Sequence, residues 1–119
     1  MRASGHRQER LAEQIRDEIA EILALGELRD PRIGFTTVTR VELTSDLSHA
    51  RVLVSVLGSE KIQRNTVEGL FSATGYLRRE ITRRLRLRRS PELNFVLDHG
   101  PEEGLKVETL LQKLKDREK

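Results

Sequence analysis

The 119-residue sequence contains no cysteine and few aromatic residues. Without cysteine the chain can form no disulfide, hold no metal through thiolates and use no cysteine nucleophile, and this absence agrees with a reducing compartment. Aromatic residues make up only 3% of the sequence, which limits any surface on which nucleic-acid bases could stack. The aromatic residues are Phe35, Phe71, Tyr76 and Phe95.

Long hydrophobic runs are also missing. No stretch approaches the roughly 20 apolar residues that span a membrane, and the opening segment MRASGHRQER lacks the apolar core of a signal peptide. We therefore expect a cytoplasmic protein that does not bind membranes. Its length fits one domain with a single core.

Charge is abundant and unevenly distributed. The chain carries a net charge of +3 and a pI near 9.7. Residues 77–89 hold seven arginines and one glutamate, a net charge of +6, so the rest of the chain sums to −3. The basic character is thus a local feature of one segment.

Periodicity in the first half predicts one helix followed by two strands. Apolar residues from Leu11 to Leu23 recur at steps of three and four, which predicts a helix over residues 6–25 that ends at Gly26. The β-branched stretches FTTVTRVEL (35–43) and HARVLVSVLG (49–58) predict strands, and the short turn between them predicts an antiparallel hairpin. In the first strand one face would carry Phe35, Thr37, Thr39, Val41 and Leu43.

The second half predicts two helices, a strand and a final helix. Ser59 can cap a helix whose apolar positions are Ile62, Val67, Leu70 and Phe71. The pattern falters at SATG (72–75) and restarts with Leu77, Ile81 and Leu85 as a third helix. ELNFVL (92–97) alternates as a strand, and a short C-terminal helix would follow with Val107, Leu110, Leu111 and Leu114. The fold class is therefore α+β in two layers, a three-stranded sheet covered by helices.

Catalytic and metal-binding patterns are weak. His6, His49 and His99 lack the spacing of a metal pair, and the sequence has no phosphate-binding GxxxxGK[ST] loop. Asp46 and His49 could be neighbours, but an Asx-turn beside a surface histidine explains them more simply. Acidic residues of the first helix, such as Glu13 and Glu21, are typical of a solvated face. We therefore expect a protein that is not an enzyme and uses no cofactor or metal.

The arginine segment has two interpretations. Arginine's planar guanidinium can grip phosphate oxygens through two hydrogen bonds and stack on bases, so a cluster of arginines is typical of nucleic-acid binding. Alternatively, the arginines pair with the acidic first helix and serve only the fold or its solubility. Seven cations against one local acid leave charge unpaired, which favours nucleic-acid binding.

Gly75 also has two interpretations. It could be the C-cap of the second helix. Alternatively, a kink between two helices could let a nucleic-acid backbone come close and meet the exposed amides of the third helix. K-homology (KH) domains hold nucleic acid with a GXXG loop at this topological position. This sequence has Ala73, Thr74 and Gly75 there, so ordinary KH binding does not follow.

Three segments resemble one known family, bacterial ribosome-binding factor A. DPRIGFTTVTRVELTSDLSHARVLVSVLG (30–58) is similar to the most characteristic segment of that family, and the Ala-x-Gly interruption at 73–75 matches it. PELNFVLDHGPEEGLKVETLL (91–111) is similar to its last strand and tail. The resemblance covers nearly the whole chain.

The resemblance implies a type II KH-like fold, αββααβ, with an interrupted Ala-x-Gly helix kink. It also implies a non-catalytic assembly factor that binds the free 30S small ribosomal subunit and assists late maturation of its 16S rRNA, including 5′-end processing, and growth in the cold. Release by a ribosome-associated GTPase and a monomeric state are further implications. The alternatives are a generic KH-type RNA-binding protein without ribosome specificity and a protein-interaction module.

Carried onto this chain, the resemblance places RNA contact at the kink and on the third helix. We expect a KH-like RNA-binding domain over residues 1–98 and a helical tail over residues 99–119. The expected RNA-binding residues are Ala73, Thr74, Gly75, Tyr76, Arg78, Arg79, Arg83, Arg84, Arg86, Arg88 and Arg89.

Overall fold

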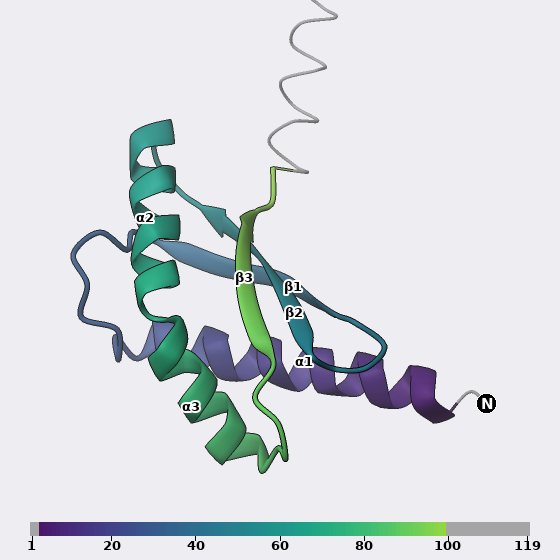
Figure 1. Cartoon of the computed structure of the whole chain (residues 1–119). Coiled ribbons are helices and arrows are strands. Elements are labelled where there is room, and N and C mark those ends of the chain that lie inside the picture. The colour runs from purple at the N-terminus through teal and green to yellow at the C-terminus, as the bar shows by residue number, and fades with distance from the viewer. Residues whose placement is uncertain (1–2, 100–119) are drawn as a thin grey trace, which may run out of the picture.

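A computed structural model describes residues 3–99 and contains three helices and three strands in that part of the chain (Figure 1). The elements are α1 (Ala3–Ala24), β1 (Thr36–Leu43), β2 (His49–Val56), α2 (Glu60–Ser72), α3 (Thr74–Leu85) and β3 (Glu92–Leu97). The predicted order αββααβ is confirmed. The predicted C-terminal helix at 107–114 lies outside the described residues.

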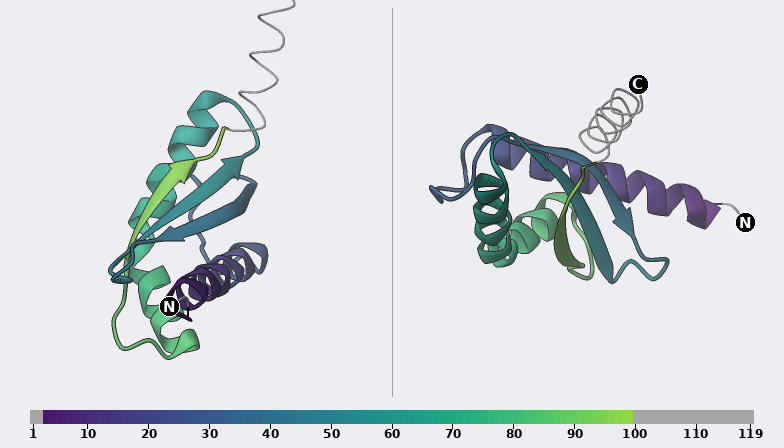
Figure 2. Two further views of the ribbon diagram at one scale, coloured as in Figure 1. Left: turned by 90° about the vertical axis from the view of Figure 1, so that its right-hand side faces the viewer. Right: turned by 90° about the horizontal axis from the view of Figure 1, so that it is seen from above.

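The three strands form one sheet in the order β1-β2-β3. β1 and β2 pair antiparallel, as the hairpin prediction requires, and β3 pairs parallel to β2. All three helices lie on one side of the sheet, with α1 packed on β1 and α2 on β3 (Figure 2). The two-layer arrangement is therefore confirmed, and within residues 3–99 the other face of the sheet has no helix over it.

The core lies between the helices and the inner face of the sheet. Ile15, Ile19 and Ile22 of α1 are completely buried, as their spacing predicts. They meet the inward residues of β2, which include Val52 and Val54. Full burial of one such side chain contributes about 1.5–3 kcal/mol. The helix they belong to ends as predicted, because Gly26 adopts a φ of 68° and Glu27 N donates to Ile22 O at 3.1 Å.

β1 departs from strict alternation, so the prediction that Phe35, Thr37, Thr39, Val41 and Leu43 share one face is wrong in the first half of the strand. The register shifts between Val38 and Arg40, where a β-bulge inserts Thr39. Val38 and Val41 are both buried, although an unbroken strand would place them on opposite faces. Phe35, expected to share the face of Val41, is 74% exposed.

The face of α2 that packs inward also differs from the prediction. Phe71 is 71% exposed, whereas Thr66 is completely buried. The Thr66 hydroxyl donates to Ile62 O at 2.8 Å and accepts from Gly34 N at 3.0 Å, so the loop before β1 satisfies it. The helix turns toward this loop, and that rotation leaves Phe71 outside.

Candidate nucleic-acid interface

The junction of α2 and α3 consists of one residue, Ala73, with φ −90° and ψ 1°. Gly75 is the second residue of α3 and does not have positive φ, so the C-cap interpretation of Gly75 is wrong. Thr74 begins α3, and its hydroxyl donates to Phe71 O at 2.8 Å. This bond ties the start of α3 to the last turn of α2.

The first turn of α3 brings three backbone amides to this junction. The first hydrogen bond of α3 runs from Leu77 N to Ala73 O at 2.9 Å. The amides of Thr74, Gly75 and Tyr76 precede this bond and therefore have no partner within their own helix. Gly75 is exposed, and no side chain of its own covers these amides. Amides at a helix N-terminus favour an anion. This junction therefore suits a phosphate, provided that the neighbouring side chains also attract negative charge.

A hollow of about 480 Å³ lies beside these amides on α3. Its lining residues are Gly75, Arg78, Arg79, Thr82, Arg83 and Ser90. Thr82 carries a buried hydroxyl oxygen that has no hydrogen-bond partner in the described part of the chain. We call this surface the α3 hollow. It brings together four of the residues predicted from the sequence and adds Thr82 and Ser90.

Arg78 holds the wall of the α3 hollow together. Its Nε donates to the Ser90 hydroxyl at 3.1 Å and to Pro91 O at 3.0 Å, and its NH2 donates to Ser90 O at 2.9 Å. These bonds fix the segment after α3 against the helix. Arg78 therefore has a structural task in addition to the RNA contact predicted for it.

Three more of the predicted arginines, Arg86, Arg88 and Arg89, line a second hollow of about 430 Å³, at the opposite end of α3. It is lined by Leu11, Asp46, Leu47, Arg86, Leu87, Arg88, Arg89 and Pro91. Arg86 adopts the left-handed conformation, with φ 53°, and so ends α3. The structure thus distributes the predicted arginines over two neighbouring hollows that meet at Ser90 and Pro91.

Arg84 and Tyr76 face inward to acidic partners. Arg84 lies 3.0 Å from Glu27, 3.2 Å from Glu80 and 3.4 Å from Glu18, and its side chain is only 19% exposed. Tyr76 OH donates to Glu27 at 2.8 Å, and this bond raises the pKa of Tyr76. Of the two interpretations of the arginine segment, pairing with acidic residues of the fold is therefore the correct one for Arg84.

Arg83 is paired differently. It is exposed and contacts Glu80 at 2.7 Å on its own helix. The hydrogen bond from Arg83, with help from Arg84, lowers the pKa of Glu80. A pair this exposed contributes little to stability, so Arg83 remains available to an anion.

Four of the predicted arginines are exposed and have no side-chain partner within residues 3–99. They are Arg79, Arg86, Arg88 and Arg89. Acidic residues of the fold thus neutralise Arg83 and Arg84 and leave these four charges open. This uncompensated charge is what a polyanionic partner would meet.

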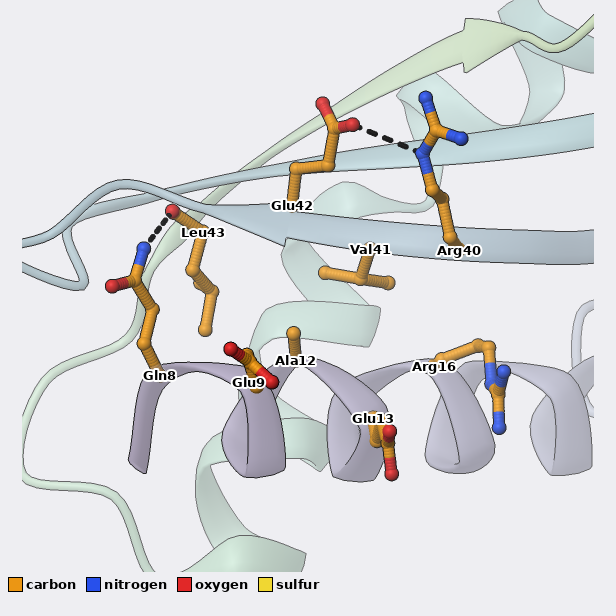
Figure 3. A pocket seen from close by; sticks show the side chains of 9 residues that line it. All are labelled: Gln8, Glu9, Ala12, Glu13, Arg16, Arg40, Val41, Glu42 and Leu43. Atoms are coloured by element: carbon orange, nitrogen blue, oxygen red, sulfur yellow. Dashed lines mark hydrogen bonds and ion pairs between the residues drawn. The ribbon is translucent and has the colours of Figure 1, made fainter. Parts of the chain in front are cut away.

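A third hollow, of about 380 Å³, lies between α1 and the free edge of β1 (Figure 3). Gln8 Nε2 closes one end by donating to Leu43 O at 2.6 Å. Glu42 points away from α1 and is bound by Arg40 at 2.9 Å and Arg51 at 2.8 Å. Its charged lining residues are three glutamates and two arginines, so this groove has no excess positive charge for a nucleic acid.

The turn between β1 and β2 confirms the Asx-turn interpretation. Asp46 accepts hydrogen bonds from the Ser48 hydroxyl at 2.7 Å, the Thr44 hydroxyl at 2.8 Å and Ser48 N at 3.1 Å. The bonds from Ser48 and Thr44 lower the pKa of Asp46 to about 2. His49 Nδ1 lies 2.9 Å from the Ser48 hydroxyl, but that hydroxyl donates to Asp46, so His49 is not positioned as its base.

Residues 3–99 contain neither a candidate metal site nor a candidate membrane-spanning helix. No group of three or more histidine, cysteine, aspartate or glutamate side chains there could hold a metal ion. No helix in the same range has the length and apolar character needed to cross a bilayer.

The order of elements and the arginine-bearing third helix define a class of small α+β proteins with the KH-like topology. A family model described as ribosome-binding factor A matches residues 7–111. The chain belongs to the ribosome-binding factor A family.

Relatives and solved structures agree with this assignment. The chain is 50% identical to ribosome-binding factor A of Koribacter versatilis over 118 residues, covering 99% of this chain and 95% of the relative. It is similar to the crystal structure of ribosome-binding factor A from Thermus thermophilus, with 31% identity, a TM-score of 0.65 and coverage of 76% of this chain and 94% of that one. A homology model of the Thermus thermophilus factor fitted into a cryo-EM map of a 30S-RbfA complex matches with 30% identity, a TM-score of 0.55 and coverage of 71% and 92%.

Proposed function

We propose that this protein is a non-catalytic ribosome assembly factor that binds the free 30S small subunit through its 16S rRNA. The observation that carries the proposal is the α3 hollow, where the first amides of α3 lie beside Arg79, whose charge the fold leaves uncompensated, and beside the exposed Arg83. Family membership supports the choice of RNA, because a relative has been fitted into a map of a 30S complex. In this role the factor assists late maturation of 16S rRNA, including 5′-end processing, and supports growth in the cold.

The proposed mechanism is a clamp on the RNA backbone. Phosphates would meet the amides of Thr74 and Gly75, while Arg79 and Arg83 supply charge-assisted hydrogen bonds. Arg86, Arg88 and Arg89 would extend the contact beyond α3. Arg78 would act mainly by holding Ser90 in place, and Arg84 and Tyr76 by joining α3 to α1 through Glu27. The bound factor would keep immature rRNA in a conformation that excludes premature translation.

Further parts of the proposal concern organisation and partners. Residues 1–98 would form the RNA-binding domain, and residues 99–119 would act as a separate tail. The protein would work as a cytoplasmic monomer and leave the subunit with the help of a ribosome-associated GTPase. The alternative function is a generic KH-type RNA-binding protein, which would bind unrelated structured RNA with similar affinity.

Co-sedimentation tests the proposal directly. The protein should pellet with free small subunits and not with large subunits or assembled ribosomes, and the bound fraction should fall steeply as salt rises. Equal pelleting with all three particles would favour the generic RNA-binding alternative. Failure to pellet with any of them at low salt would contradict both.

Two glycines of the helix pair offer a matched test of the junction. A Cβ added at Gly75 would meet only Arg79 NH1, at an ordinary 3.5 Å, whereas one at Gly69 would lie 2.7 Å from Ile33 Cγ1. Gly75→Ala should therefore keep or raise the free energy of unfolding, by up to about 1 kcal/mol. Gly69→Ala should lower it by about 1–3 kcal/mol. Denaturant unfolding measures both changes.

Binding to small subunits should change in the opposite order: the glycine whose substitution is harmless to stability should be the one whose substitution weakens binding. The methyl group of Gly75→Ala would stand between a phosphate and the first amides of α3, so affinity for small subunits should fall by about 10-fold or more. Gly69→Ala, measured well below its unfolding temperature, should bind like the unaltered protein. Full affinity in Gly75→Ala would show that the backbone of the RNA does not approach this amide.

A further inference from the structure

Phe71 is exposed at the edge of the α2–α3 junction. Its side chain is 71% exposed, although its spacing in the sequence predicted a core position. A single exposed apolar residue is ordinary on a protein surface, so exposure alone assigns nothing. Among the four aromatic side chains, however, only Phe35 and Phe71 are largely exposed, and only Phe71 adjoins the first amides of α3.

The backbone that carries Phe71 is held in place on both sides. Phe71 O accepts the bond from the Thr74 hydroxyl at 2.8 Å. The next side chain, Ser72, accepts a bond from Arg32 NH2 at 3.0 Å, and Arg32 is itself fixed by Asp30 at 2.6 Å. The ring therefore projects from a fixed base, and little conformational freedom would be lost when a partner binds.

The charges around Phe71 suit a nucleotide. Gly75 stands four residues beyond Phe71, across the junction at Ala73, and Arg79 stands one turn further along α3. Arg79 is exposed and has no partner among residues 3–99. Glu68 is the nearest acidic residue along α2. Arg32 interacts electrostatically with Glu68 and so offsets its negative charge.

We propose that Phe71 is a stacking platform for an unpaired base of the RNA strand whose phosphates occupy the α3 hollow. This proposal rests on the proposed function and adds to it that the bound RNA is unpaired at this point. The bond from the Thr74 hydroxyl to Phe71 O holds the start of α3, and thus a phosphate at the amide of Gly75, beside the residue that carries this ring. In a duplex the faces of the bases are covered by their neighbours, so the strand at Phe71 is single-stranded there. Stacking on one ring tolerates any base, so the contact selects unpaired RNA without selecting a sequence.

Tryptophan fluorescence tests the stacking because the unaltered chain contains no tryptophan. Phe71→Trp and Phe35→Trp each introduce one reporter at an exposed aromatic position. An oligouridylate of about 12 nucleotides should quench the reporter at position 71, and the same strand in a duplex with oligoadenylate should quench it far less. The reporter at position 35 should not respond to either RNA. Equal quenching at both positions, or by both RNAs, would overturn the proposal.

Affinity measurements complete the test with free small subunits and with the oligouridylate. Phe71→Ala should weaken binding about 10-fold while Phe35→Ala leaves it unchanged, and the dependence on salt should stay the same because no charge is removed. Phe71→Leu should be nearly as weak as Phe71→Ala. If leucine restores affinity, the contact is a general apolar one and stacking is wrong.

The failure of this proposal can be told apart from failure of the proposed function. Salt-dependent binding that Phe71→Ala does not weaken would remove the stacking platform and leave the phosphate clamp intact. Absence of any salt-dependent binding by the unaltered protein would remove both. Both phenylalanines are exposed, so circular dichroism should show all these variants folded.

Discussion

Replacing Arg79 and Arg88 with glutamine should weaken binding to free small subunits by about 100-fold at 0.1 M salt. Each phosphate contact releases nearly one counterion, which corresponds to about 10-fold in affinity at that concentration. The slope of log affinity against log salt should become shallower by about 1.5–2. Both side chains are exposed and unpaired within residues 3–99, so stability should not change. A salt series of co-sedimentation or filter-binding measurements gives affinity and slope together.

The matched control removes the same charge from the opposite side of the molecule. Arg40 and Arg51 are exposed on the face of the sheet that no helix of residues 3–99 covers, and both pair with Glu42. Arg40→Gln with Arg51→Gln changes the net charge equally, so it should reproduce only the weak effect of total charge. If the two double variants lose affinity to the same extent, the interaction is a general attraction and the site on α3 is wrong.

Much of the fold follows from the sequence because the signals involved are local. The isoleucines of α1 recur at helical spacing and are completely buried, and the alternating valines of β2, a stretch predicted to be a strand, are buried as well. Ser59 caps α2 as expected, with its hydroxyl accepting from Ile62 N at 3.2 Å. In each case the physical cause of the structure lies in residues that are close along the chain. Periodicity or residue type is therefore sufficient to predict it.

The errors occur where tertiary contacts decide. Nothing in FTTVTRVEL signals the bulge at Thr39, whose hydroxyl is held by Leu53 O at 3.1 Å and Asp98 at 2.8 Å. Phe71 is exposed because α2 buries the face of Thr66, Gly69 and Leu70, and Thr66 accepts a hydrogen bond from Gly34 N in the preceding loop. Partners that lie tens of residues away determine both features.

The same distinction applies to the candidate site. Residue type singled out the arginines, and spacing placed Leu77 and Ile81 opposite them. Which arginines are neutralised depends on residues from elsewhere in the chain, namely Glu18 and Glu27 for Arg84. Ser90 and Thr82 were missed because serine and threonine carry no signal of their own, although Thr82 stands one helical turn after Arg78. A search for polar residues one turn from each arginine would have found it.

Replacing Arg84 with methionine should lower the midpoint of thermal unfolding by several degrees at pH 7. Methionine keeps much of the side-chain volume but leaves Glu18, Glu27 and Glu80 close together without their common cation. Removing one partner from a largely buried group of charges is destabilising because the remaining charges stay poorly solvated. Arg83→Met on the same helix is the control. It removes one exposed pair, so its midpoint should hardly change.

The pH dependence of this difference identifies its origin. The pKa of Glu80 is lowered in the folded protein from an ordinary value of 4.5, first by Arg83 and in addition by Arg84. The part of this stabilisation that depends on Arg84 is complete above pH 4.5 and is lost as pH falls through the lowered value. The gap in midpoint between the unaltered protein and Arg84→Met should therefore be widest near neutral pH and close under acid conditions. A gap that persists undiminished below that range would mean that packing of the arginine stem, and not its charge, stabilises the fold.

Binding then separates the two arginines by function. Measured well below both unfolding midpoints, Arg83→Met should weaken small-subunit binding and flatten its salt dependence, because Arg83 faces the α3 hollow. Arg84→Met should leave the salt slope nearly unchanged, because its guanidinium faces the glutamates inside the molecule. A larger change in slope for Arg84→Met than for Arg83→Met would place Arg84 among the phosphate contacts. The interior network would then have to open when RNA binds.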